Sequence, residues 1–185
     1  MFEEVIAKIA SALNAQKIPY MIIGGQAVLL YGEPRLTRDI DITLGIGVDS
    51  AATLVKTAKK IGLKPLPSDT QDFIRKTWVL PCEDKKSKIR VDFIFSFTPY
   101  ERQAIERAKF VKLGRVRVKF ASLEDVIIHK IFAGRPRDIE DIESMLAKNK
   151  RVDISYIKKR LKEFDVAAPE RRLLKTFGNI IKRKY

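Results

Sequence analysis

The fold is decided by residues 20–44, YMIIGGQAVLLYGEPRLTRDIDITL. This stretch contains a short apolar run at residues 20–23, a glycine pair, a helical pattern at residues 26–32 and a second apolar run at residues 40–44. Short apolar runs bounded by turn residues are typical of buried strands, and the helical pattern follows the glycine pair directly. The stretch therefore predicts a strand, a helix and a second strand, in that order.

The sequence on either side has the same mixed character. Apolar residues at helical spacing predict helices, whereas alternation of apolar and polar residues predicts strands. The predicted helices lie at residues 3–16 and 49–61 and from residue 122 onward, with interruptions at Gly134, Pro136 and Pro169. The predicted strands lie at residues 77–81 and 88–97, with a hairpin at residues 110–120. We therefore expect an α/β (α+β) fold with a mixed β-sheet core and packed helices in residues 1–121. Residues 122–185 are expected to form a basic C-terminal helical region that packs on the core and contributes to the active site.

The composition is that of a soluble globular protein, with 45% hydrophobic and 32% charged residues. No apolar run approaches the roughly 20 residues of a membrane span. The first residues lack the basic segment and apolar stretch of a secretory signal. The single cysteine, Cys82, excludes an intramolecular disulfide and a cysteine-built metal site. These features predict a cytoplasmic protein without a membrane-spanning segment.

The formal net charge is +14, and its distribution is uneven. Residues 151–185 carry 11 Lys or Arg against four Asp or Glu, a net of +7. Such an excess costs self-repulsion and indicates a polyanionic partner such as nucleic acid. The alternative is that the charge serves solubility, or reflects the lysine-rich composition of thermophilic proteins.

The glycine pair, Gly24 and Gly25, stands where a strand gives way to a helix. Glycine lets the backbone come close to a phosphate, and a helix N-terminus supplies free N–H groups and a favourable dipole. The pair therefore indicates a phosphate-binding turn, although glycine pairs also form ordinary turns.

Asp39 and Asp41 flank Ile40 on the second strand of the deciding stretch. Residues two apart on a strand point to the same side, so both carboxylates face one region of space. They repel each other unless a cation lies between them, and oxygen ligands of this kind suit Mg²⁺. The alternative is an edge strand whose acids are solvated.

Asp92 lies inside an otherwise apolar strand pattern. A lone acid in such a strand is costly to bury unless it is paired or binds a metal. It could instead form a salt bridge with Arg90, two residues away on the same face. The aromatic residues of this strand, Phe93, Phe95 and Phe97, alternate and are predicted to be core. Taken with the glycine turn and the paired aspartates, Asp92 points to phosphoryl-transfer chemistry, with two carboxylates bridging metals and a third activating the incoming hydroxyl.

Two blocks of sequence resemble the minimal nucleotidyltransferases of the DNA polymerase β-like superfamily, over roughly residues 15–147. The nearest branch is the AbiEii-like family, which includes toxin components of toxin–antitoxin systems and MenT-type tRNA-modifying enzymes. The first block is Gly24-Gly25-Gln26-Ala27-Val28, Tyr31-Gly32 and Arg35-Leu36-Thr37-Arg38-Asp39-Ile40-Asp41; the second is Ser122-Leu123-Glu124-Asp125, His129-Lys130 and the segment 133–142, which contains Arg135-Pro136-Arg137-Asp138.

The resemblance implies a role for each matching residue. Asp39, Asp41 and Asp92 would be the catalytic carboxylates and the ligands of Mg²⁺ (or Mn²⁺). Lys130 would be catalytic and contact the triphosphate of an NTP, and Asp138 would fix it. The nucleotide-binding set is Gly24, Gly25, Gln26, Arg38, Lys130 and Asp138. The superfamily often has Gly-Ser at the phosphate-binding turn, so Gln26 is a departure that leaves backbone N–H groups as the donors there.

The predicted function is therefore metal-dependent transfer of an NMP from an NTP onto an acceptor hydroxyl, with release of pyrophosphate. The basic C-terminal region favours RNA, and tRNA in particular, as the acceptor, and the resemblance implies a toxin-type enzyme with an antitoxin partner. A glycosyltransferase with an Asp-x-Asp motif would explain Asp39 and Asp41 but not Gly24 or Asp92. The alternative from another class is a non-catalytic nucleic-acid-binding protein with a nucleotidyltransferase-like fold.

Overall fold

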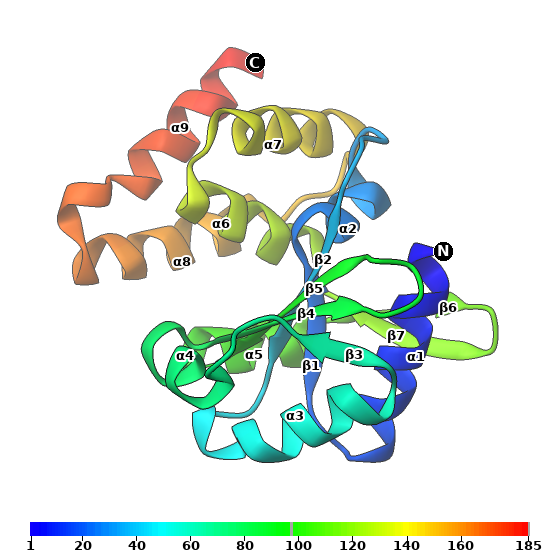
Figure 1. Cartoon of the computed structure of the whole chain (residues 1–185). Helices are drawn as coiled ribbons and strands as arrows, with labels where there is room; N and C mark the ends of the chain where they lie inside the picture. The colour runs from blue at the N-terminus through cyan, green and yellow to red at the C-terminus, as the bar shows by residue number, and fades with distance from the viewer. Residues whose placement is uncertain (97, 185) are drawn as a thin grey trace. The chain divides into compact units, whose positions relative to one another are not determined.

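The strand–helix–strand unit around the glycine pair forms as the sequence predicts. A computed structural model describes residues 1–96 and 98–184, and in it β1 is Tyr20–Ile23, α2 is Gly24–Tyr31 and β2 is Asp39–Leu44 (Figure 1). All four residues of β1 are buried. The helix begins at Gly24 rather than at residue 26, and Gly24 takes a φ of +62°, which costs a glycine little.

The chain forms two compact units. We call the first the sheet unit; it consists of Met1–Gln26 and Leu36–Ala121. We call the second the helical unit; it consists of Ala27–Arg35 and the chain from Ser122 onward. The helical unit thus combines the short segment 27–35 with the C-terminal helices.

Among the described residues, the sheet unit contains a seven-stranded mixed sheet in the order β3-β4-β5-β2-β1-β7-β6. Two of its pairings, β2 with β5 and β1 with β7, are parallel, and the remaining pairings are antiparallel. The other strands are β3 (Leu63–Pro65), β4 (Val79–Asp84), β5 (Arg90–Phe95), β6 (Lys109–Leu113) and β7 (Val116–Phe120). The predicted mixed sheet is thus confirmed.

Four helices and a 3-10 turn of the sheet unit pack along these strands. They are α1 (Phe2–Ala15), η1 (Val48–Ser50), α3 (Ala51–Lys60), α4 (Thr70–Thr77) and α5 (Pro99–Arg107). α1 contacts β7, α3 contacts β3, α4 contacts β4 and α5 contacts β2. The apolar spacing that predicted α1 is its buried face, formed by Val5, Ile6, Ile9, Ala10 and Leu13. The sequence had not predicted β3, α4 or α5.

The two central parallel strands have one apolar and one charged face. The apolar side chains of Ile40, Ile42, Val91, Phe93 and Phe95 are at most 1% exposed, so they form core as predicted. Alternate positions along the same strands point the other way. Phe97, which was predicted to continue the core series, lies outside the described residues. This alternation places the acidic residues of both strands on a single face.

The helical unit is built from α6 (Leu123–Ala133), α7 (Pro136–Lys148), α8 (Ile154–Ala167), η2 (Pro169–Arg171) and α9 (Leu173–Lys184), together with the end of α2. The Ser122 side chain caps α6 by accepting from the backbone N–H of Asp125 (3.2 Å), and Gly134 ends that helix with a φ of +65°. α6 contacts α7, α8 and α9. Buried apolar residues of these helices form the core of the unit: Ile127, Ile142, Met145, Leu161 and Phe177.

The helices of the described chain are too short or too polar for membrane insertion. Within residues 1–96 and 98–184, none combines the length and the apolar character that a membrane span requires.

Candidate active site

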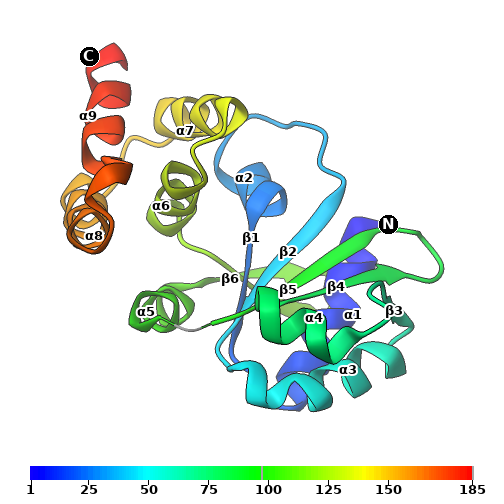
Figure 2. The same ribbon diagram turned by 60° about the vertical axis from the view of Figure 1, so that its left-hand side comes forward.

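The charged face of the sheet unit brings together residues from two strands that are far apart in the sequence. β2 and β5 run side by side (Figure 2), and their register pairs Asp39 with Arg90 and Asp41 with Asp92. Residues paired in this way on neighbouring strands point to the same side of the sheet. The three predicted aspartates of the site therefore share one face, and Arg90 shares it with them.

Arg90 neutralises part of this negative charge by pairing with Asp92. Its Nε donates to both carboxylate oxygens of Asp92, at 3.0 Å and 3.1 Å. The hydrogen bond to Asp92 is the main cause of a raised pKa of the Arg90 guanidinium, and the charges of Asp92, Asp39 and Asp41 act in the same direction. The salt bridge that the sequence offered as an alternative role for Asp92 is therefore present.

Gly24 is needed where α2 begins because the Asp41 carboxylate lies against it. A Cβ placed on Gly24 would lie 2.0 Å from Oδ2 of Asp41, and the residue also has a positive φ. The carboxylate therefore lies close to the first turn of the helix, where the N–H groups carry partial positive charge. The glycine was predicted to make room for phosphate; in the structure it makes room for one of the aspartates.

The remaining predicted residues of this unit surround the same strand and helix ends. Gln26 is only 7% exposed, and its side-chain Nε2 has no hydrogen-bond partner. A buried amide donor without a partner is costly, so it marks a place where a ligand or water would be stabilised. Thr37 donates its hydroxyl to Oδ1 of Asp39 at 3.4 Å, and Arg38 beside it is exposed. Gly25 is buried in the first turn of α2.

The donor set suits a hard divalent cation, but it is not arranged around one. Three carboxylates on one face are the oxygen ligands that Mg²⁺ and Mn²⁺ prefer. Within the described part of the chain, however, no three His, Cys, Asp or Glu side chains converge as metal ligands would. One of the three carboxylates is already engaged, because the Arg90 guanidinium is bonded to Asp92 and neutralises it. A cation could be held by Asp39, Asp41 and Asp92 once Arg90 has released Asp92.

The helical unit holds the second group of predicted residues. The Lys130 side chain is 11% exposed and its ammonium pairs with Asp138 at 2.6 Å and with Asp141 at 2.9 Å. Asp138 also accepts from the backbone N–H of Arg135 (3.1 Å), and Asp141 is bonded by Arg35 at 2.8 Å and 3.0 Å. The predicted pairing of Lys130 with Asp138 is thus present, as part of a larger buried network of two cations and two carboxylates.

Sequence reasoning had not assigned a role to Asp141 or Arg35, although both lie in the motif blocks. A signal for Asp141 was available: it follows Asp138 by three residues on a helix, and residues at that spacing share a face. No comparable signal identified Arg35, because its partner is more than 100 positions away in the sequence.

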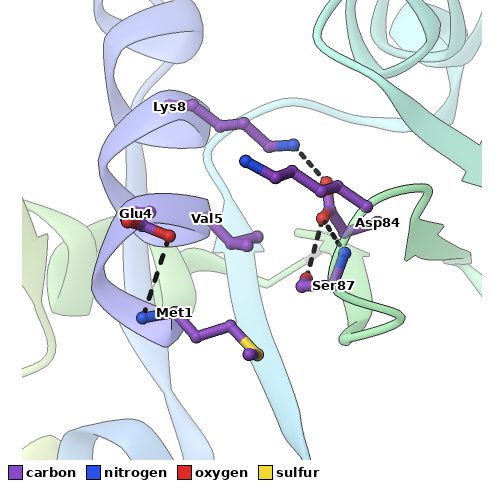
Figure 3. A pocket seen from close by; sticks show the side chains of 7 residues that line it. Met1, Glu4, Val5, Lys8, Asp84 and Ser87 are labelled. Carbon is purple, nitrogen blue, oxygen red and sulfur yellow. Dashed lines mark hydrogen bonds and ion pairs between the residues drawn. The ribbon is translucent and has the colours of Figure 1, made fainter.

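A separate cavity of about 540 Å³ lies between α1 and the β4–β5 turn, lined by Met1, Glu4, Val5, Lys8, Asp84, Lys86 and Ser87 (Figure 3). The buried acid of this cavity is Asp84, and its carboxylate accepts hydrogen bonds from neighbouring side chains and backbone. Lys8 donates to Asp84, and both the backbone N–H and the hydroxyl of Ser87 donate to the same carboxylate. Burial alone would raise the pKa of Asp84, but the bonds from Lys8 and Ser87 outweigh it and lower the pKa to about 2. This cluster therefore fastens α1 to the sheet.

Comparison with known proteins identifies the fold. Residues 99–183 match the family described as nucleotidyltransferase of unknown function (DUF6036). Among solved structures, an antigenic nucleotidyltransferase-like protein from Paracoccidioides brasiliensis is 18% identical, with a TM-score of 0.60 over 94% of this chain and 91% of that one. The antibiotic-resistance factor ANT(2'')-Ia is 15% identical, with a TM-score of 0.62 over 91% and 95%. The lincosamide antibiotic adenylyltransferase LnuA, in its lincomycin-bound form, is 16% identical, with a TM-score of 0.53 over 76% and 94%. No curated protein matches the chain by sequence.

These similarities bear out the prediction of a mixed α/β nucleotidyltransferase fold. The solved structures are too distant in sequence to carry over a substrate. The family and the three structures named above do not carry the name of the AbiEii-like toxin branch that the motif blocks resemble.

Proposed function

We propose that the chain is a metal-dependent nucleotidyltransferase that moves an NMP from an NTP onto an acceptor hydroxyl of RNA. The observation that carries the proposal is the shared face of β2 and β5, where the register places Asp39 and Asp41 beside Asp92. Keeping three carboxylates and one guanidinium on one face costs stability that apolar residues would not. Such a cost is expected where the charges serve catalysis.

In the proposed reaction, the acceptor oxygen attacks the α-phosphorus of the NTP, and the bond from that phosphorus to the pyrophosphate oxygen breaks. Asp92 accepts the proton of the acceptor hydroxyl on a carboxylate oxygen. Asp39 and Asp41, with Asp92, would hold a divalent cation, which would neutralise charge on the phosphate oxygens. Arg90, displaced from Asp92, remains beside the same carboxylates as a cation that can bind phosphate.

The nucleotide is proposed to bind where α2 begins. The N–H groups of the first turn of α2 and the helix dipole favour the phosphates, and Nε2 of Gln26, without a partner among the described residues, supplies a further donor. Exposed Arg38 adds positive charge next to Asp39. Lys130 is assigned a contact with the triphosphate on the resemblance. Its two carboxylate partners support a fixed position for the ammonium, which lies 2.6 Å from Asp138 and 2.9 Å from Asp141.

RNA is proposed as the acceptor because of the charge of the chain. The net charge is +14, and the segment from residue 151 to the end carries half of it. A tRNA is the preferred member of this class, because the motif blocks resemble a branch that includes tRNA-modifying enzymes. Antibiotic adenylyltransferases share the fold, so a small-molecule hydroxyl is the acceptor to test beside RNA.

The test is an incubation with Mg²⁺, total RNA and each NTP labelled at the α-phosphate, beside the Asp41→Asn variant. The expected result is label on RNA with the wild type and none with the variant. Asp49→Asn is the matched control, because Asp49 is an exposed acid outside the charged face. A γ-labelled NTP should leave the RNA unlabelled, which separates nucleotidyl from phosphoryl transfer. Equal labelling by wild type and Asp41→Asn would refute the proposed site.

A toxin-type role with an antitoxin partner is part of the proposal and rests on the resemblance of the motif blocks. Expression of the wild type should then arrest growth of a bacterial host, whereas Asp41→Asn should not. Growth arrest by both proteins at equal expression would show that any toxicity does not come from the proposed chemistry.

A non-catalytic nucleic-acid-binding protein is the second candidate. It is favoured by one observation: Arg90 occupies Asp92, and the acids of the described chain do not converge as metal ligands. This candidate predicts RNA binding that is unaffected by Mg²⁺ and no turnover of any NTP. NTP binding that requires Mg²⁺ would reject it.

A further inference from the structure

The β6–β7 hairpin at one edge of the sheet carries an unusual outer face. Its register pairs Phe110 with Lys119 and Lys112 with Arg117, so these four side chains lie on the same face of the hairpin. The opposite face includes Val118 and Phe120, which are 0% and 3% exposed. The inner face is therefore core, and the outer face consists of an aromatic ring among cations.

Phe110 is the centre of that outer face. Its side chain is 53% exposed, which is high for a large apolar residue. The guanidinium carbon of Arg117 lies 4.1 Å from the centre of its ring, and the ammonium of Lys119 lies 5.4 Å from it. Both distances are within the range of cation–π attraction. We call the exposed Phe110 ring, with the Arg117 guanidinium stacked over it, the platform.

The hairpin has no compensating acids. Residues 109–119 contain five Lys or Arg and no Asp or Glu. This part of the surface is therefore positive, and it complements a polyanion.

Protection of a sheet edge explains only part of this pattern. β6 is the last strand of the sheet, and lysines on an edge strand discourage pairing with another chain. Lys109 and Lys112 fit that role. An exposed phenylalanine on the same strand works against it, because apolar edge residues favour association. The presence of Phe110 among the cations therefore needs another reason.

We propose that the outer face of the β6–β7 hairpin binds single-stranded nucleic acid. Lys112 and Arg115 contact phosphates, and a base stacks on the platform formed by Phe110 and Arg117. Aromatic rings next to basic side chains on a sheet surface bind unpaired bases in this way, because every base has a π face. The inference goes beyond the proposed reaction and stands without it, since binding requires neither NTP nor a metal.

The test is a binding titration without nucleotide, using fluorescently labelled oligonucleotides of about ten residues. One arm uses RNA, one uses single-stranded DNA of the same sequence, and one uses the duplex. All measurements use the Asp41→Asn background, so that catalysis plays no part. Phe110→Ala is expected to weaken binding of the RNA strand by at least about fivefold, the lower end of the range for loss of one stacked base. Phe110→Trp should retain binding, and its fluorescence should be quenched by the bound strand.

Matched controls separate stacking from charge. Phe73→Ala removes another exposed phenylalanine of the sheet unit (37% exposed) and should leave affinity unchanged. Lys112→Gln should flatten the dependence of log affinity on log salt by about 0.7, the value for one phosphate contact on a single strand. Lys60→Gln, an exposed cation on α3, should not.

The outcomes decide the inference independently of the transfer reaction. Comparable affinity for RNA and single-stranded DNA would support base stacking on the platform. It would also mean that residues elsewhere in the chain distinguish RNA from DNA. Equal binding by Phe110→Ala and Phe73→Ala, or duplex binding as tight as single-strand binding, would overturn it. A circular dichroism spectrum and unfolding midpoint equal to those of the wild type confirm that Phe110→Ala is folded, as its exposure predicts.

Discussion

Arg90→Gln is expected to strengthen divalent-cation binding at the three aspartates. Arg90 donates to both oxygens of Asp92, at 3.0 Å and 3.1 Å, and stands opposite Asp39 in the neighbouring strand. A cation that takes Asp92 as a ligand must first break this pair. Removing the guanidinium removes that cost and leaves the carboxylates in place.

The size of the effect follows from the exposure of the pair. The side chain of Arg90 is 57% exposed and that of Asp92 is 17% exposed, so water screens the interaction. A pair of this kind contributes about 1 kcal/mol or less, well below the cost of breaking a buried pair. Its loss should lower the dissociation constant for the cation by up to about fivefold. The weaker repulsion from the positive charge near Asp39 and Asp41 acts in the same direction.

The assay is a Mn²⁺ titration in which the paramagnetic resonance signal of the free ion reports binding. Arg75→Gln is the matched control, because Arg75 is also exposed and pairs with a carboxylate, at 3.9 Å on α4. We expect tighter binding for Arg90→Gln and no change for Arg75→Gln. Unchanged or weaker binding by Arg90→Gln would refute the competition between Arg90 and the cation, and would indicate that Arg90 positions Asp92 as a ligand.

Three further predictions concern stability. Gly24→Ala should destabilise the protein by at least about 1–2 kcal/mol in denaturant unfolding, because the left-handed backbone and the nearby carboxylate both oppose a side chain. Gly47 has open space around it, so Gly47→Ala should change the unfolding free energy little. Equal effects of the two substitutions would contradict this account. Lys130→Met should cost about 3 kcal/mol by stranding buried acids, against about 1 kcal/mol or less for the more exposed Lys148→Met, measured by the same method. Asp84 has a pKa of about 2 in the folded chain against 3.8 ordinarily, so its contribution is present above pH 3.8 and is lost as the pH falls towards 2. The difference in unfolding free energy between wild type and Asp84→Asn should shrink across that range; a constant difference would show that the ionised carboxylate is not responsible.

Much of the fold could be predicted because local pattern and tertiary environment agree. Residues 3–16 have a clear apolar stripe and form α1, and the run at residues 20–23 is buried on every side as β1. α4 was missed because it is short and buries only Ile74, so no periodic pattern exists to detect. α5 was missed although it carries a signal: Thr98 and Glu101 form a reciprocal capping box around a proline at the helix start.

The sequence predicts which residues make up the candidate site, but not which partner Asp92 has in the folded chain. Asp39 and Asp41 share a face by strand alternation alone, which the sequence shows directly. The pairing of Asp41 with Asp92 depends on the register between β2 and β5, which is set by packing of residues about 50 positions apart. Whether Asp92 faces a cation or Arg90 depends on the balance of two interactions of similar size, and no local pattern records it. Asp141 could have been predicted from its helical spacing to Asp138, and the structure shows it paired with Lys130.

The most direct test of the central claim is the position of Mn²⁺ in crystals grown with a non-hydrolysable NTP analogue. We predict an anomalous scattering peak about 2.0–2.5 Å from carboxylate oxygens of Asp39 and Asp41, with the analogue's phosphates completing the shell and Arg90 turned away from Asp92. A peak elsewhere, or bound analogue with the Arg90–Asp92 pair intact and no metal at these strands, would contradict the assignment of this face as a nucleotidyltransferase site.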